Sequence, residues 1–198
     1  MKGKRKMNRT LIAIALALTL IPGFAVAATW NASDIVLSGT VGSGGNASYL
    51  VVDFSSASYA FKYLWDAPTT GTLTGENLIL ALTDSTAGVT GLSVAYDVWT
   101  GLGMAPNTFS YDGNSGVADY PNPYWNYWTG SAGEAQAYSW VGCSGSYLTN
   151  GSIDSWVFSA DWTQAPSIPG VPEPSSMLAL GSLIGLAGSA KLLRGRRK

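Results

Sequence analysis

Hydrophobic residues are distributed unevenly along the chain. Both ends are continuously apolar next to basic clusters, and the long body between them alternates short apolar stretches with turns. In the body, residues 48–54 and 58–65 are rich in β-branched and aromatic side chains. In the second stretch, an aromatic residue occupies every other position from Tyr59 to Trp65, which is the period of a β-strand. We therefore predict a β-hairpin over residues 48–65.

One segment has the period of a helix instead. Leu78, Ile79 and Leu82 recur at helical spacing. Thr74 is a residue type favoured at the N-cap, and Glu76 suits the positive end of the helix macrodipole in the first turn. We predict one short helix of about two to three turns here.

The other apolar stretches of the body predict further strands, separated by turns rich in Gly, Asn and Ser. They comprise a short run at 35–37 followed by a glycine loop through Gly39, Gly42, Gly44 and Gly45, strands at 91–99, 107–111, 135–141, 146–148 and 152–158, and a tight turn at 112–116. Short strands at this spacing are typical of a β-sandwich. The expected fold is mainly β. It is a single sandwich-like antiparallel β domain with one short internal helix, flanked by an N-terminal signal helix and a C-terminal transmembrane helix.

The N-terminal segment carries positive charges first, an apolar run next and small residues last. A cluster of Lys and Arg at residues 2–9 precedes an apolar run from Leu11 to Ile21. The small residues that signal cleavage requires follow at Ala25, Ala27 and Ala28. We predict that residues 1–28 are a signal peptide, read by Sec-type export machinery and removed by cleavage after Ala27 or Ala28. An uncleaved N-terminal anchor is the alternative, which the short apolar run disfavours.

The C-terminal segment combines a tripeptide bracketed by prolines, an apolar run and a basic end. Pro172, Glu173 and Pro174 form an extended, exposed segment because each proline fixes its own φ and restricts the residue before it. Residues 175–193 reach the roughly 17–25 residues that a membrane-spanning helix needs. The basic residues after this span are Arg194, Arg196, Arg197 and Lys198. Because such cations stay on the cytoplasmic side, we predict a transmembrane helix with a basic stop; a buried C-terminal core helix is the alternative.

The order of Val171-Pro172-Glu173-Pro174-Ser175-Ser176, an apolar helix and a terminal arginine cluster resembles the PEP-CTERM sorting signal, over residues 171–198 only. The resemblance implies that an exosortase-like membrane protease recognises the chain at Pro172, Glu173 and Pro174. It also implies a precursor held in the inner membrane by its C-terminal helix, with a periplasmic domain. Delivery to the cell surface or extracellular matrix follows, often beside exopolysaccharide. The tail implies routing and says nothing about the activity of the body.

The charges are segregated along the chain. Residues 29–170 contain eleven of the twelve acidic residues but only one cation, Lys62. Nucleic acid is bound by Lys and Arg against phosphate, so this composition argues against a nucleic-acid partner. Cations, neutral sugars and uncharged surfaces remain as partners. We predict an acidic, Trp-rich β domain at 29–163, joined to the tail by a proline-containing linker at 164–170.

Histidine is absent from the whole chain. This absence removes Ser-His-Asp and Cys-His catalysis and the usual zinc and copper ligand sets. Cys143 is the only cysteine, so no internal disulfide forms; burial in an apolar site is favoured over pairing with another molecule. A pair of carboxylates could hydrolyse a glycoside, but acids this scattered are usually surface residues. We therefore expect no catalytic residues, no cofactor and no enzymatic activity.

An aromatic block at Tyr124, Trp125, Tyr127 and Trp128 is the leading candidate for a binding surface. An exposed row of Tyr and Trp would stack on sugar rings or on protein surfaces. The alternative is that these residues fill the core, because a domain poor in Leu and Ile needs large aromatic side chains there. The core alternative is favoured.

Residues 112–119 resemble half of a calcium loop. Asp112, Asn114 and Asp119 offer oxygen ligands, and Gly113 permits the turn. The bidentate Glu at the far end of an EF-hand loop is missing, so a plain hairpin turn is favoured over a metal site.

Two functions from different classes agree with these observations. The first is an exported surface or extracellular-matrix protein with a non-enzymatic role in adhesion or matrix association. The second is a secreted ligand-capture module that holds a sugar or small planar ligand on aromatic faces. Burial of Trp125 and Trp128 in the core would favour the first.

Overall fold

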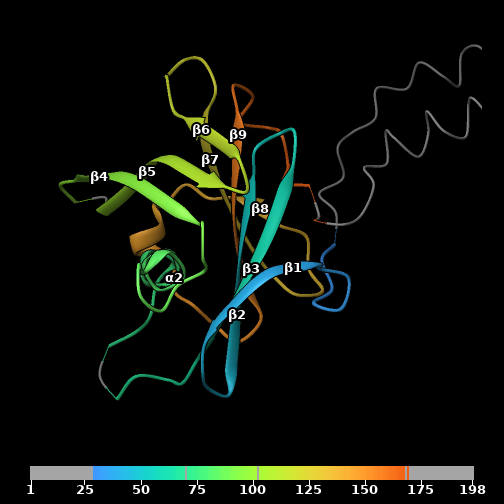
Figure 1. Cartoon of the computed structure of the whole chain (residues 1–198), viewed down its shortest axis with the longest axis vertical. Helices are drawn as coiled ribbons and strands as arrows, with labels where there is room; N and C mark the ends of the chain where they lie inside the picture. The colour runs from blue at the N-terminus through green and yellow to red at the C-terminus, as the bar shows by residue number, and fades with distance from the viewer. Residues whose placement is uncertain (1–28, 70, 102, 168, 170–198) are drawn as a thin grey trace, which may run out of the picture.

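Two β-sheets and one helix form the fold seen in the computed structural model, which describes residues 29–69, 71–101, 103–167 and 169 (Figure 1). The elements in chain order are β1 (Leu37–Gly42), β2 (Asn46–Asp53), β3 (Ser58–Trp65), α2 (Gly75–Thr83), β4 (Ser93–Trp99), β5 (Gly103–Tyr111), β6 (Asn114–Val117), β7 (Tyr124–Ser131), β8 (Ala137–Tyr138), the short 3-10 helix η2 (Cys143–Gly145) and β9 (Ser152–Ser159). Six strands form one sheet in the order β1-β3-β2-β9-β7-β8, and three form the other in the order β4-β5-β6. The prediction of a mainly β, sandwich-like fold with one short α-helix is confirmed.

The prediction of an antiparallel domain is wrong in part, because the six-stranded sheet is mixed. Strand β1 pairs with β3 in parallel, and β2 pairs with β9 in parallel. The predicted hairpin is confirmed as β2 and β3, whose antiparallel register runs from Asn46 opposite Trp65 to Asp53 opposite Ser58. Parallel neighbours are joined by long connections, so no turn motif in the sequence predicts their pairing.

Strand β1 corrects the predicted glycine loop. Residues 37–42 form a strand, and only residues 43–45 turn into β2. Glycine is needed at Gly44, where φ is +147° and a Cβ atom would lie 2.2 Å from the carbonyl carbon of Trp65. At Gly42, φ is +77° and a Cβ atom would lie 2.3 Å from the carbonyl oxygen of Leu64. These glycines therefore allow the β1–β2 connection to pass close to the end of β3.

The predictions for the second half of the body are partly wrong. The strand expected at 135–141 is reduced to the two residues of β8, and the segment 146–148 contributes one isolated bridge, between Thr74 and Tyr147. The aromatic block forms β7, which pairs antiparallel with β9 along its whole length. The strands expected at 91–99, 107–111 and 152–158 are present as β4, β5 and β9.

Helix α2 begins after Thr74, as predicted, and ends at Thr83. Asn77 Oδ1 accepts a hydrogen bond of 2.9 Å from the backbone N–H of Thr74 and so satisfies a donor just ahead of the first turn. Leu78, Ile79 and Leu82 are fully buried and attach the helix to the core.

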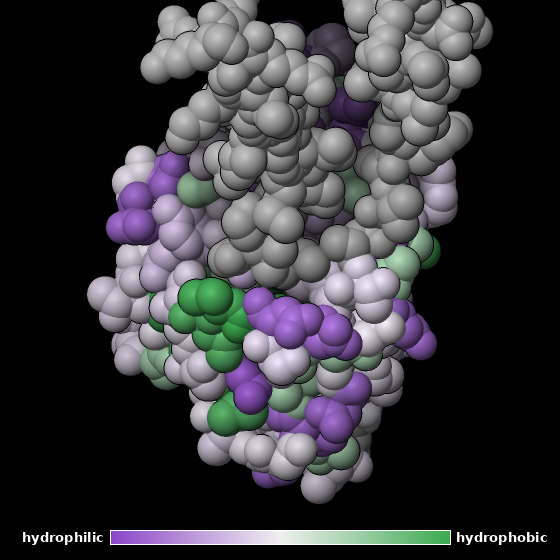
Figure 2. Space-filling model, turned by 90° about the vertical axis from the view of Figure 1, so that its right-hand side faces the viewer, coloured by the Kyte–Doolittle hydropathy of each residue, from purple (hydrophilic) through white to green (hydrophobic). Residues whose placement is uncertain are grey.

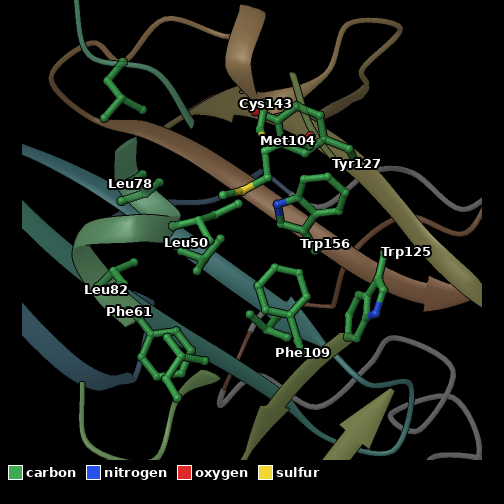
Figure 3. Close-up of a cluster of buried hydrophobic side chains, with 14 of the residues drawn as sticks. Leu50, Phe61, Leu78, Leu82, Met104, Phe109, Trp125, Tyr127, Cys143 and Trp156 are labelled. Atoms are coloured by element: carbon green, nitrogen blue, oxygen red, sulfur yellow. Dashed lines mark hydrogen bonds between the residues drawn. The ribbon is translucent and has the colours of Figure 1, made fainter. Parts of the chain in front are cut away.

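The main hydrophobic core lies between the six-stranded sheet, the helix α2 and the smaller sheet (Figure 3). Phe109 of β5 contacts Trp125 of β7 edge to face, with ring centroids 4.9 Å apart. It also lies 6.0 Å from the ring of Trp156 of β9. These aromatic contacts hold the two sheets together, as expected of large side chains in a core with few Leu and Ile residues.

The opposite face of the large sheet carries a second, smaller core. Trp30 and Ile35, which precede β1, cover Tyr49 and Val51 of β2 and Ile153 of β9. Seen from the side on which β1 lies in Figure 1, the strongly hydrophobic surface is limited to small spots among pale and hydrophilic residues (Figure 2). The part of this side that the described residues form is therefore mostly of low or intermediate hydropathy.

The last described residues are bound to the ends of β2 and β3. Ser167 donates two hydrogen bonds to Asp53 Oδ2, from its backbone N–H at 2.9 Å and from its hydroxyl at 2.6 Å. The hydroxyl of Ser58 donates to the carbonyl of Ser167 at 3.1 Å, and the N–H of Val36 donates to the carbonyl of Pro169 at 3.5 Å. The described part of the predicted linker thus packs against the sheet.

None of the helices in the described ranges is both long enough and apolar enough to cross a lipid bilayer. The predicted signal peptide at 1–28 and the predicted span at 175–193 lie outside the described residues. So do the sorting residues Pro172, Glu173 and Pro174 and the basic end at 194–198.

Candidate functional site

The structure divides the predicted aromatic block between the two faces of β7. Trp125 and Tyr127 point into the main core and are buried (Figure 3). Trp128 lies on the opposite face, also buried, and Tyr124 on that face is half-buried. The favoured core role is therefore observed for Trp125 and Tyr127, whereas Tyr124 and Trp128 belong to the outer face.

Trp128 is the base of a cluster of aromatic side chains at the β8 edge of the large sheet. We call Trp128, Tyr138, Trp140 and Trp162 the aromatic cluster. Tyr138 lies opposite Trp128 in the β7–β8 pair, with ring centroids 5.7 Å apart at an interplanar angle of 86°. Tyr138 also contacts Trp140 at 5.0 Å and Trp162 at 5.7 Å, and Trp140 and Trp162 are 6.0 Å apart. Three rings thus contact one another above a fourth that is buried.

The outer rings of this cluster face solvent. Trp140 is 83% exposed and Trp162 is 49% exposed. Each of the two tryptophans meets Tyr138 edge to face, at more than 60°, and their own planes are tilted by 54° to each other, so none of the three rings is stacked on another. A large aromatic face of Trp140 therefore remains free to receive a planar or apolar ligand surface.

Short hydrogen-bonded turns fix the two exposed tryptophans. Asp161 Oδ1 accepts hydrogen bonds from the N–H of Thr163 at 2.8 Å and from its hydroxyl at 2.6 Å, which closes a turn around Trp162. On the other side, the N–H of Ser139 donates to the carbonyl of Tyr127 at 2.8 Å, and its hydroxyl donates to the carbonyl of Val141 at 2.9 Å. Both rings are thus held by ordered backbone.

Two tyrosines extend the aromatic surface along β7. Tyr120, which is 80% exposed, lies 5.5 Å from the ring of Tyr124. Partial burial, followed by the nearby Tyr138, Tyr120 and Asp161, raises the pKa of the Tyr124 hydroxyl above its ordinary value. Tyr124 therefore remains a neutral hydrogen-bond donor and acceptor near the aromatic cluster.

Five of the six buried side-chain atoms without hydrogen-bond partners in the described part of the chain lie on or beside this face of the sheet: Asn126 Oδ1, Trp128 Nε1, Ser155 Oγ and both amide atoms of Gln136. The sixth, Trp156 Nε1, lies in the main core on the other face. Asn126 and Trp128 share this face of β7, and Ser155 lies directly opposite Trp128 on β9. Most buried polar groups in proteins are paired, so this concentration of unpaired ones on one face of the sheet is unusual.

The charge near the aromatic cluster is negative. Hydrogen bonds from the side chain and backbone of Thr163 lower the pKa of Asp161, the residue before Trp162. Lys62, the one cation of the described residues, lies over the ring of Tyr49 at 5.9 Å. Its strand β3 is four positions from β8 in the sheet, about 19 Å away at the usual spacing between strands.

A second cluster of polar side chains is buried where β9 meets the start of α2. The hydroxyl of Tyr127 donates a hydrogen bond of 2.6 Å to Asp154 Oδ2. Burial raises the pKa of Asp154 to about 7, and the hydrogen bond from Tyr127 opposes this shift. Gly75, the first residue of α2, leaves room for this carboxyl: a Cβ atom there would lie 2.2 Å from Asp154 Oδ2.

Cys143 lies beside this buried carboxyl, and its predicted burial is confirmed. Burial, reinforced by Asp154 and Glu76, raises the pKa of the Cys143 thiol to about 12. The thiol donates a weak hydrogen bond to the carbonyl of Met104. A thiol in this state is a poor nucleophile, because the thiolate is the reactive form. The Cys143 side chain is therefore suited to packing in the core.

The residues of the calcium candidate are not brought together. Asp112 and Gly113 have φ of +49° and +78° and form the two-residue turn between β5 and β6, so the favoured hairpin is confirmed. Asp112 accepts from the hydroxyl of Tyr59 at 3.3 Å, whereas Asp119 lies beyond the other end of β6 and accepts from Asn122 at 3.4 Å. Within the described ranges, no three Cys, Asp or Glu residues are grouped as metal ligands would be.

The binding surface predicted from the sequence lacks Tyr138, Trp140 and Trp162. These residues lie outside the aromatic block at 124–128, ten or more positions after Trp128. One local signal was available: Trp140 and Trp162 each stand among Ser, Gly, Asp and Thr residues, which is a turn composition that leaves a large side chain exposed. Comparison with family models, with curated proteins and with solved structures finds no match for this chain.

Proposed function

We propose that this chain is an exported surface or extracellular-matrix protein, routed by its C-terminal sorting signal, whose β domain has a non-enzymatic role in adhesion or matrix association. The observation that carries the adhesive role is the aromatic cluster, in which Trp140 is 83% exposed. Isolated exposed apolar side chains are common on proteins, but three mutually contacting exposed or half-exposed rings form a contiguous contact surface.

Routing is supported by the two ends of the sequence. A signal peptide at 1–28 would deliver the chain across the membrane, and the span at 175–193 would hold it there until an exosortase-like protease acts near Pro172, Glu173 and Pro174. The structure adds a consequence for the tail. Because Ser167 is bound to Asp53, the tripeptide begins only five residues from a point attached to the domain, about 18 Å of extended chain at most.

The alternative function, a secreted ligand-capture module, is favoured by the same aromatic cluster and by the unpaired buried polar groups on that face of the sheet. The two roles are compatible if the captured ligand is a component of the matrix. The same surface would then bind the ligand and attach the protein to the matrix.

Fractionation of the producing cells tests the routing. We expect the intact tail in the inner-membrane fraction and a chain without Arg196, Arg197 and Lys198 at the cell surface or in the medium, as read by mass spectrometry. A Glu173→Ala chain should accumulate in the membrane. Recovery of the protein from the cytoplasm with residues 1–28 intact would contradict export.

Attachment is tested separately with surface variants. Trp140→Ala and Trp162→Ala should release the exported protein from the cell surface into the medium. Trp99→Ala is the matched control, because Trp99 is 57% exposed but lies on β4 of the smaller sheet. Equal retention of all three variants would refute adhesion through the aromatic cluster.

A further inference from the structure

We propose that the aromatic cluster is a binding site for a neutral polysaccharide, with Trp140 and Trp162 stacking on the apolar faces of sugar rings. The inference rests on the proposed function and names the chemical class of its partner. Three sets of observations support it: the geometry of the rings, the polar groups beside them and the sign of the charge around them.

The ring geometry suits a sugar chain more than a second hydrophobic protein surface. Trp140 and Trp162 meet at 54° with centroids 6.0 Å apart, so their faces point in different directions and present two separate platforms. Tyr138 contacts both rings from one side. Successive units of a flexible polysaccharide can occupy two inclined platforms, whereas a flat apolar partner would contact only one of them.

The polar groups provide the second requirement of a sugar site. Saccharide hydroxyls both donate and accept hydrogen bonds, and binding sites for small polar ligands combine aromatic walls with a few placed polar groups. Here Trp128 Nε1 is a donor, Asn126 Oδ1 an acceptor, and the Gln136 amide supplies one of each, all without partners in the described part of the chain. These atoms are buried, so a bound hydroxyl reaches them only if the side chains that cover them move.

The charge selects neutral chains over anionic ones. Asp161 is adjacent to Trp162, and its carboxylate is ionised at neutral pH, since hydrogen bonds from Thr163 hold its pKa below the ordinary value of 3.8. Lys62, the one cation in residues 29–167, lies across the sheet and over Tyr49. A uronate, sulfate or phosphate on the polysaccharide would meet a negative surface without a cation to pair with, which costs free energy even after screening by salt.

Affinity electrophoresis of the mature protein recovered from the producing cells tests the inference. Native gels contain graded dextran or barley β-glucan as neutral probes, and alginate as an anionic probe. We expect retardation by a neutral glucan, insensitive to added salt. Trp140→Ala and Trp162→Ala should each weaken binding about fivefold or more, a free energy typical of one aromatic contact. Trp99→Ala should bind like the natural chain.

Several outcomes would overturn the inference. They are retardation by alginate in preference to the glucans, no retardation by either neutral probe, and equal weakening by Trp99→Ala. Far-ultraviolet circular dichroism of each variant separates lost binding from lost folding, and Trp162→Phe keeps a ring in place if Trp162→Ala unfolds. If neither glucan is bound but the Trp140→Ala protein is released from cells, the adhesive role is supported and its partner is not a neutral glucan. Glucan binding without release would refute the adhesive role instead.

Discussion

The buried carboxyl of Asp154 predicts an unusual dependence of stability on pH. Its pKa rises to about 7 in the folded protein from an ordinary value of 3.8, because the side chain is buried beside Tyr127. The folded state therefore retains a proton that the unfolded chain loses above its ordinary pKa. By linkage, the free energy of unfolding falls as the pH rises through this window. It stays constant, as far as this group is concerned, below about pH 4 and above about pH 7.

The magnitude follows from the shift in pKa. Each unit corresponds to about 1.4 kcal/mol, so a shift of roughly three units makes the protein less stable at pH 8 than at pH 4 by about 4 kcal/mol. Other groups obscure the acid end of this range, whereas the absence of histidine leaves few side chains that titrate between pH 5 and 8. From pH 5 to pH 8 we expect the free energy of unfolding to fall by about 3 kcal/mol.

Replacement of Asp154 by Asn isolates the effect. The Asn side chain has nearly the same shape, accepts the hydrogen bond from Tyr127 and cannot ionise, so the dependence between pH 5 and 8 should disappear. The absolute stability will shift as well, because the buried amide introduces donors that need partners; the slope against pH is therefore the quantity to compare. Asp84→Asn is the control. Hydrogen bonds from Thr86 lower the pKa of this exposed residue, so its titration changes the stability only below about pH 4.

Urea denaturation followed by tryptophan fluorescence provides the assay, at pH 5, 6, 7 and 8 for the natural chain and both variants. The natural protein and Asp84→Asn should lose stability with rising pH, and Asp154→Asn should not. A natural chain whose stability is flat or increases over this range would refute the reasoning, and so would an Asp154→Asn variant with the natural slope.

Three further predictions test the packing. Gly44→Ala should lower stability by about 2 kcal/mol or more in urea denaturation, because its Cβ atom would meet the Trp65 carbonyl at a φ of +147°; an unchanged midpoint would contradict the close approach. Asp53→Ala should free the segment at Ser167 and speed its cleavage in limited proteolysis, whereas an unchanged rate would show that the Asp53 hydrogen bonds do not hold it. Cys143 should resist iodoacetamide at pH 8 until urea unfolds the chain, since burial raises the pKa of its thiol to about 12; rapid labelling of the folded protein would refute this burial.

The elements that the sequence predicts correctly are those whose signals are local. Helix α2 follows from the spacing of Leu78, Ile79 and Leu82 after Thr74, and the β2–β3 hairpin follows from alternating aromatic residues. The turn at Asp112 and Gly113 follows from backbone preferences of two adjacent residues. Each of these elements depends on residues within a few positions of one another, so it can be predicted without the tertiary structure.

The mixed sheet and the aromatic cluster depend on the tertiary structure. Strand β1 has a glycine-rich sequence typical of a loop and becomes a strand because β3 supplies its backbone hydrogen bonds. The β2–β9 pair joins residues about a hundred positions apart, such as Val51 and Ser155. Likewise Trp140 and Trp162 come together only because the turn after β9 brings Trp162 against Tyr138 of β8. Side chains of this kind are brought into contact by strand order, which no local pattern of residues records.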